Sequence, residues 1–92
     1  MSEHFGESRS IEGSVLRVDP IARELVLQSK SAVISVYAPP GCPIVLSDDS
    51  IRMRLIQPGD FVEIAVHRAT FGWIAERISI ERFTPAHIQV NG

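Results

Sequence analysis

Short runs of alternating apolar and polar residues, each ended by a turn signal, occupy most of the chain. Side chains of a half-buried strand alternate in direction with a period of two, so such runs predict strands. The alternation slips by one position near Leu16, which predicts a bulge in the first strand. The predicted strands are residues 11–19, 24–28, 32–38, 44–46, 61–67 and 73–80.

Turn-forming residues separate these runs. Asp19 and Pro20 predict a turn in which the aspartate carboxylate accepts a backbone hydrogen bond. Pro58 and Gly59 stand where a type II turn requires them. Gly13 lies inside the first strand, where the absence of a side chain permits a tight bend or a close backbone approach. Strands joined by such short turns predict an antiparallel meander.

The stretch 39–60 interrupts the strand pattern. It opens with three prolines, which remove backbone donors that a sheet would use. Residues 47–56 predict a short helix, because Ser47 or Asp48 can cap it. Three strands, this crossing and two more strands give the predicted fold class: all-β, a small five-stranded OB-like barrel with a short helix or irregular crossing between strands 3 and 4.

The chain of 92 residues fits one domain. Residues 1–9 are rich in serine, glutamate and glycine and predict a flexible leader. Residues 10–82 are expected to form the barrel. Residues 83–92 form a C-terminal tail, in which 87–90 is a candidate added strand on this barrel or on a neighbouring one.

Composition indicates the broad class and compartment. An apolar content of 45% suffices for a core, and the lone cysteine, Cys42, cannot form an internal disulfide. The first ten residues lack the features of a signal peptide, and no apolar run reaches the roughly 20 residues of a membrane helix. We therefore expect a cytoplasmic protein. The net charge of −2 provides no broad field for phosphate, although eight of the nine basic residues are arginine.

No motif for catalysis or metal binding emerges from the residue spacing. Cys42, Met53 and His67 could supply soft-metal ligands, but their spacing is irregular and no Cys-x-x-Cys or His-x-His pair accompanies them. The acidic residues within 48–60 fit capping and turn roles. The chain also lacks a Gly-x-Ser-x-Gly elbow. We expect no enzyme activity, no metal site and no cofactor.

Four groups of residues, mostly at turns and core positions, resemble a known family. They are Gly13-x-Val15-x-x-Val18-Asp19; Leu25 and Leu27; Leu55-x-x-Pro58-Gly59-Asp60-x-Val62; and Gly72-x-x-Ala75-x-x-Ile78. The pattern resembles the small bacterial OB-like domains of unknown function grouped as DUF5666, over residues 10–80. The resemblance implies a barrel and transfers no catalytic residue.

A second resemblance is to small periplasmic copper-binding OB domains, which share the Gly-x-Val-x-x-Val-Asp opening and the later Gly-Asp turn. Those domains place Met, His and Trp on and around the third strand. This chain has Ser35, Val36, Tyr37 and Ala38 there. The resemblance therefore implies the fold and does not imply copper binding.

Aromatic and basic residues gather on the third predicted strand and on the last two. The candidate binding residues are Tyr37, Phe61, His67, Arg68, Phe71, Trp73 and Arg77. Exposed aromatics on an OB-fold stack on bases while arginines follow the backbone, which is the single-stranded nucleic-acid alternative. The negative net charge favours instead a non-enzymatic binding or assembly module that contacts a protein or a second copy of itself, as in a dimer. No membrane association is expected.

Overall fold

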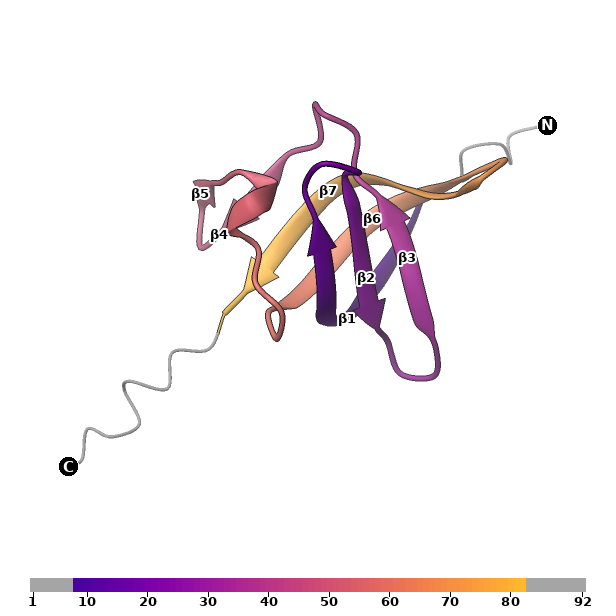
Figure 1. The fold of residues 1–92 in the computed structure, drawn as a ribbon, viewed down its shortest axis with the longest axis horizontal. Helices are drawn as coiled ribbons and strands as arrows, with labels where there is room; N and C mark the ends of the chain where they lie inside the picture. Colours follow the sequence, from indigo (N-terminus) through magenta and orange to yellow (C-terminus); the bar gives the residue numbers. More distant parts are fainter. Residues whose placement is uncertain (1–7, 83–92) are drawn as a thin grey trace.

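Strands make up almost all of the regular structure. The computed structural model describes residues 8–82, and Figure 1 shows their arrangement. The elements in chain order are β1 (Ser8–Asp19), β2 (Glu24–Gln28), β3 (Val33–Tyr37), β4 (Ile44–Leu46), β5 (Asp49–Ser50), the 3₁₀-helix η1 (Met53–Leu55), β6 (Phe61–Ala69) and β7 (Gly72–Glu81). No helix in this range is long and apolar enough to cross a membrane.

Five of the strands form a ring in the order β3-β2-β1-β6-β7. Neighbours in that order are antiparallel, and the ring is completed where β3 runs parallel to β7. The short strands β4 and β5 continue the sheet from β7 and lie to one side of the ring (Figure 1). This arrangement confirms the predicted all-β, five-stranded OB-like fold, with an irregular crossing between β3 and β6.

The long strand β1 links the two halves of the ring. Its first part pairs with β6 and its second part pairs with β2. The register shifts between Val15 and Arg17, which confirms the predicted bulge. Gly13 lies where the strand changes partner, and a Cβ there would stand 2.5 Å from the Gln28 carbonyl oxygen. The predicted close backbone approach is therefore present.

Gly13→Ala is expected to destabilise the fold by roughly 3 kcal/mol, the upper part of the usual range for overpacking. The added methyl group would meet backbone atoms of Gln28, which cannot rotate away as a side chain can. Urea unfolding followed by circular dichroism measures the change, with Ser14→Ala at the next, exposed position as the control. A Gly13→Ala variant within about 0.5 kcal/mol of the parent would contradict the close packing of β1 on β2.

The inward side chains of the ring form one apolar core, in which buried and more exposed positions alternate along the strands. Its members without exposed surface include Leu25, Leu27, Val62, Ile64 and Ile78. Met53 and Ile56 join this core from the crossing between β3 and β6. The crossing is therefore attached to the ring by apolar contacts as well as by strand pairing.

The crossing differs from the predicted capped helix. Ser47 and Asp48 both adopt positive φ, 50° and 72°, and form the two-residue turn of the β4–β5 hairpin. Positive φ at both central positions is typical of tight hairpin turns, and aspartate tolerates it better than most residues. The helical part is a single 3₁₀ turn, and Arg52 before it makes no side-chain cap. The predicted capping role of Ser47 or Asp48 is therefore wrong.

The turn before β6 ends in a buried ion pair. The Asp60 amide donates to the Gln57 carbonyl oxygen at 3.0 Å, and Gly59 has a φ of 94°, as a type II turn requires. Asp60 is only 4% exposed, and its carboxylate accepts hydrogen bonds from Arg82 Nε at 2.9 Å and Nη2 at 2.8 Å. Arg82 also donates to the Leu55 carbonyl oxygen at 2.9 Å. This pair therefore joins the turn and η1 to the end of β7.

The strand limits agree closely with the sequence predictions except at the start of β1. Strands β2 and β4 have the predicted limits, and β6 and β7 extend slightly further than predicted. Ser8 and Arg9 belong to the sheet rather than to the predicted leader, because they pair with β6. Residues 1–7, which are the rest of that leader, and the tail 83–92 with its strand candidate lie outside the described residues.

Candidate functional site

Trp73 lies at the start of β7, beside the point where the ring is completed. It pairs with Arg68 across the β6–β7 hairpin and with Val36 of β3, and its partly buried ring packs against the core. The guanidinium carbons of Arg9 and Arg68 lie 5.5 and 4.9 Å from the centroid of the indole ring. Both distances fall within the range of cation–π attraction, so the two arginines help to hold the indole in one orientation.

Trp73 also forms one wall of a cleft beside the seam between β3 and β7, which we call the aromatic cleft. Its volume is about 310 Å³, and its described lining residues are Ala22, Glu24, Ser35, Tyr37, Phe71, Gly72 and Trp73. Tyr37 is 37% exposed, and Phe71 in the β6–β7 turn is 76% exposed. A phenylalanine this exposed contributes little to the core, so its ring surface is available to a ligand.

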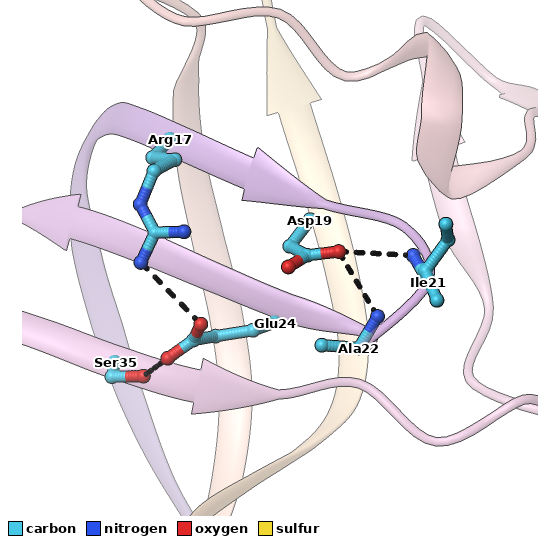
Figure 2. A network of polar contacts seen from close by, with 6 residues as sticks. All are labelled: Arg17, Asp19, Ile21, Ala22, Glu24 and Ser35. Carbon is cyan, nitrogen blue, oxygen red and sulfur yellow. Dashed lines mark hydrogen bonds and ion pairs between the residues drawn. The ribbon is translucent and has the colours of Figure 1, made fainter.

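Polar groups on β2 and β3 line another part of the cleft. Figure 2 shows the contacts that these groups make with one another and with Arg17. The Glu24 carboxylate lies 3.5 Å from Arg17 Nη2 and accepts a hydrogen bond from the Ser35 hydroxyl. A carboxylate has about four acceptor positions, so Glu24 can accept further hydrogen bonds from a ligand. Strand register places this group in the cleft, because Glu24 pairs with Tyr37.

The β1–β2 turn fixes a further part of the cleft wall. The Asp19 carboxylate accepts hydrogen bonds from the backbone amides of Ile21 at 3.1 Å and Ala22 at 3.0 Å, as Figure 2 shows. These bonds confirm the predicted aspartate turn. They also hold Ala22 at the cleft, whereas the neighbouring Ile21 is 94% exposed and is not among the lining residues.

Four of the seven residues singled out from the sequence come together in the structure. Tyr37, Phe71 and Trp73 line the aromatic cleft, and Arg68 stacks on the Trp73 ring. They come from β3, from the β6–β7 turn and from the two strands on either side of it. The parallel pairing of β3 with β7 is what makes them neighbours.

Phe61, His67 and Arg77 lie away from this group. Phe61 begins β6, at the end of the strand far from the β6–β7 hairpin. His67 is adjacent in register to the Arg68–Trp73 pair and therefore points to the opposite face, where its Nδ1 lies 2.8 Å from Glu76 Oε2. Arg77 is exposed further along β7. The seven residues therefore do not form one continuous aromatic and basic face.

The sequence pattern gives no direct sign of three residues at the site: Arg9, Glu24 and Ser35. Arg9 falls in the predicted leader, so nothing suggested its position above Trp73. Glu24 and Ser35 are brought to the cleft by the β2–β3 pairing, in which Leu25 lies opposite Val36. The alternation of buried residues on these two strands and the length of their loop determine that register.

The soft-metal ligands weighed from the sequence are not gathered at one point. Cys42 and Met53 border the same depression, whereas His67 lies on β6. Burial raises the pKa of the Cys42 thiol above its ordinary value, and the charge of Arg23 opposes this shift by a smaller amount. Within residues 8–82, no three His, Cys, Asp or Glu side chains are placed to hold a metal ion.

Comparison with known proteins finds similar folds and no family. No family model matches the sequence, and no curated protein matches it. Apo-CusF from Escherichia coli has a similar structure, with a TM-score of 0.70 at 14% identity over 89% of this chain and 96% of that one. CusF with Ag(I), also from Escherichia coli, gives a TM-score of 0.70 at 12% identity over 88% of this chain and 100% of that one. At such identities the likeness establishes the fold alone.

These structures correct two expectations. CusF is a periplasmic protein, which contradicts the expected cytoplasmic location. CusF was solved with Ag(I) and, as a variant, with Cu(II), and these neighbours give no support to the expected protein or second-copy partner, so that expectation is withdrawn. The expected location rested on a missing export signal, and a missing signal does not identify a compartment. The expected partner rested on the negative net charge and on the edge surface of a small barrel, and neither of these identifies a ligand. The resemblance to DUF5666 stays a prediction, because no family model matches.

The residues of β3 do not fit a site for Ag(I) or copper. Val36 is buried in the core, Ser35 donates its hydroxyl proton to Glu24, and Tyr37 lines the aromatic cleft. None of these side chains offers the sulfur or imidazole donor that a soft ion prefers. Residues 35–37 therefore provide no donors for a soft-ion site on β3.

Proposed function

We propose that this protein is a small non-enzymatic binding module whose ligand site is the aromatic cleft. One observation carries the proposal: Tyr37 of β3 and Phe71 and Trp73 of the β6–β7 hairpin converge on one cleft, and the Tyr37 and Phe71 rings leave surface exposed there. Aromatic rings are large apolar groups that usually become buried, so two exposed rings beside the partly buried Trp73 favour a surface that a ligand covers.

The chemistry of the cleft favours a small organic ligand with a flat or apolar face and at least one hydrogen-bond donor. The rings provide surfaces for stacking, and the Glu24 carboxylate and Ser35 hydroxyl provide acceptors on the same cleft. The volume of about 310 Å³ is at the small end of the range for ligand pockets. A compact heterocycle or a sugar-like ring has this combination of size, face and donors.

The side chains of the aromatic cleft are preorganised for binding. Arg9 and Arg68 fix the Trp73 ring, the Asp19 turn fixes Ala22, and Ser35 fixes the Glu24 carboxylate. Groups held in place by the protein lose less conformational entropy on binding. Phe71 is the exception, since it lies in the hairpin turn and is largely exposed. We expect it to close over the ligand.

The test uses intrinsic fluorescence, because Trp73 is the one tryptophan of the chain. A library of small heterocycles and sugars is titrated against the full chain, and saturable changes of Trp73 emission identify ligands. Phe71→Ala is expected to weaken the affinity of such a ligand by roughly 5- to 150-fold, since one aromatic contact is worth about 1–3 kcal/mol. Its unfolding free energy should change by less than about 0.5 kcal/mol, because the ring is exposed.

Ile21→Ala is the matched control. It removes an exposed apolar side chain close to the cleft but outside its lining, so the affinity should not change. Equal losses in Phe71→Ala and Ile21→Ala, or no loss in either, would overturn the proposal. A library that produces no saturable change of emission would also overturn it.

A further inference from the structure

A second depression, separate from the aromatic cleft, is lined by arginines. It lies between the β1–β2 turn, the proline-rich segment after β3 and the residues around η1, and its volume is about 340 Å³. Arg23, Arg52 and Arg54 are three of its nine described lining residues, and none of the nine is acidic. We call this depression the arginine pocket. Three like charges around one depression without a carboxylate create a local positive potential.

Arg23 is held at this pocket by the backbone. It has a positive φ of 60°, and its side chain donates from Nε to the Ala38 carbonyl oxygen at 2.8 Å and from Nη2 to the Pro39 carbonyl oxygen at 3.1 Å. A guanidinium group has five N–H donors, so three remain after these two bonds. Within residues 8–82, Arg23 has no ion pair with a carboxylate. Its charge and its remaining donors are therefore available to an anion.

Arg52 and Arg54 are placed on either side of a buried anchor. Met53 between them is 3% exposed and belongs to the core, whereas both arginines are exposed. No ion pair forms between either of them and a carboxylate of the described chain. By contrast, Arg17 and Arg82 each pair with a carboxylate. The guanidinium groups at the pocket therefore differ from those of Arg17 and Arg82, whose charges are compensated within the described chain.

The walls of the pocket suit a small charged ligand. Pro20 and Pro40 restrict the two loops that border it, and the Cys42 thiol on its edge is kept neutral by burial, which raises its pKa. The positive charge of Arg23 opposes this rise by a smaller amount, so Arg23 acts electrostatically on the thiol at the pocket edge. No group on the described lining would repel an anion electrostatically.

We propose that the arginine pocket binds a phosphate group, either as inorganic phosphate or as part of a small phosphate ester. The planar fork of arginine matches two oxygens of a phosphate, and charge-assisted hydrogen bonds of this kind are about twice as strong as neutral ones. The ligand would take the remaining donors of Arg23 while Arg52 and Arg54 close around it from the exposed side. This site does not depend on the aromatic cleft.

Nuclear magnetic resonance titration of the full chain tests the proposal, with sodium phosphate and glycerol 3-phosphate as probes against sodium chloride at matched ionic strength. Saturable shifts are expected for the arginine Nε–H signals of the pocket and for the amides of Gly41, Cys42 and residues 51–55. Equal affinity for both probes identifies the phosphate group alone as the ligand. Tighter binding of glycerol 3-phosphate identifies a phosphate ester.

The double variant Arg52→Gln/Arg54→Gln should weaken phosphate binding at least tenfold without lowering the melting temperature, because both side chains are exposed. Arg77→Gln is the control, since it removes one exposed positive charge on β7, outside the pocket lining. Phosphate shifts that do not saturate would show general charge attraction and overturn the proposal. An equal loss of phosphate affinity in Arg77→Gln and in the double variant would do the same. An absence of shifts with both probes would overturn it as well.

Discussion

Truncation of Ile78 to alanine is expected to remove about 3–5 kcal/mol of stability, the largest effect of any single change considered for this protein. Ile78 has no exposed surface and pairs with Ile64 on β6 and with Ile44 on β4. Three strands therefore meet at this side chain. Its neighbours are themselves packed, so they can fill only part of the cavity that the truncation leaves.

Guanidinium unfolding followed by circular dichroism measures this loss. For a domain with a typical stability of about 5–15 kcal/mol, the Ile78→Ala variant would be close to its folding limit. Ile21→Ala is the control, because Ile21 is 94% exposed and its truncation should change the stability by less than about 0.5 kcal/mol. If Ile78→Ala and Ile21→Ala lost similar amounts of stability, the result would contradict the packing of β4 and β6 around a buried Ile78.

Replacement of Asp60 by asparagine is expected to cost about 2–4 kcal/mol at neutral pH, because it leaves a partner charge without compensation. The side chain of Asp60 is almost fully buried and that of Arg82 is 31% exposed, so solvent screens this pair only in part. Asparagine can still accept the hydrogen bond that the Gln57 amide donates at 2.9 Å. The loss therefore reports mainly on the ion pair.

The same pair predicts a pH dependence. The hydrogen bonds from Arg82 hold the pKa of the Asp60 carboxyl below its ordinary value, burial opposes this shift, and the Gln57 amide and the Arg82 charge lower the pKa further. Because the pKa is lower in the folded state, the stabilisation is fully present above the ordinary aspartate pKa of about 3.9. It is lost as the pH falls through the folded-state pKa.

Unfolding free energies of the parent and of Asp60→Asn at several pH values between 7 and 2 test this dependence. The difference between the two proteins should stay constant down to about pH 5 and shrink below about pH 4. Asp49→Asn, at an exposed position of β5, should show no such change. A difference between parent and Asp60→Asn that persists unchanged to pH 2 would contradict a charged Asp60 in the fold.

Much of the fold could be predicted because its signals are local. The alternation of residues 24–28 and the type II turn at Pro58 and Gly59 depend on neighbours in the chain, and both agree with the structure. The segment after β4 could not be resolved in this way. Ser47 and Asp48 suit both a helix start and a tight hairpin turn, and the parallel pairing of β4 with β7, more than 30 residues away in the chain, accompanies the hairpin.

The candidate site was less predictable because it depends on contacts between distant strands. Tyr37 and Trp73 were identifiable as aromatic residues, but their proximity follows from a parallel pairing of only two residue pairs. Phe61 and His67 had the same chemistry in the sequence and lie elsewhere, since strand position and face separate them from the cleft. Arg23 gave no sequence signal at all, because its role depends on backbone carbonyl groups of the segment after β3.

Whether the aromatic cleft is the ligand site is tested most directly by locating the residues that a bound ligand contacts. An amide-resolved nuclear magnetic resonance titration should use the small heterocycle or sugar that changes Trp73 emission, with the parent and Phe71→Ala compared at the same concentrations. Saturable shifts are predicted at Glu24, Ser35, Tyr37 and residues 71–73, with a loss of affinity of at least fivefold in Phe71→Ala. Shifts confined to other strands, or an unchanged affinity in Phe71→Ala, would contradict a binding function at this cleft.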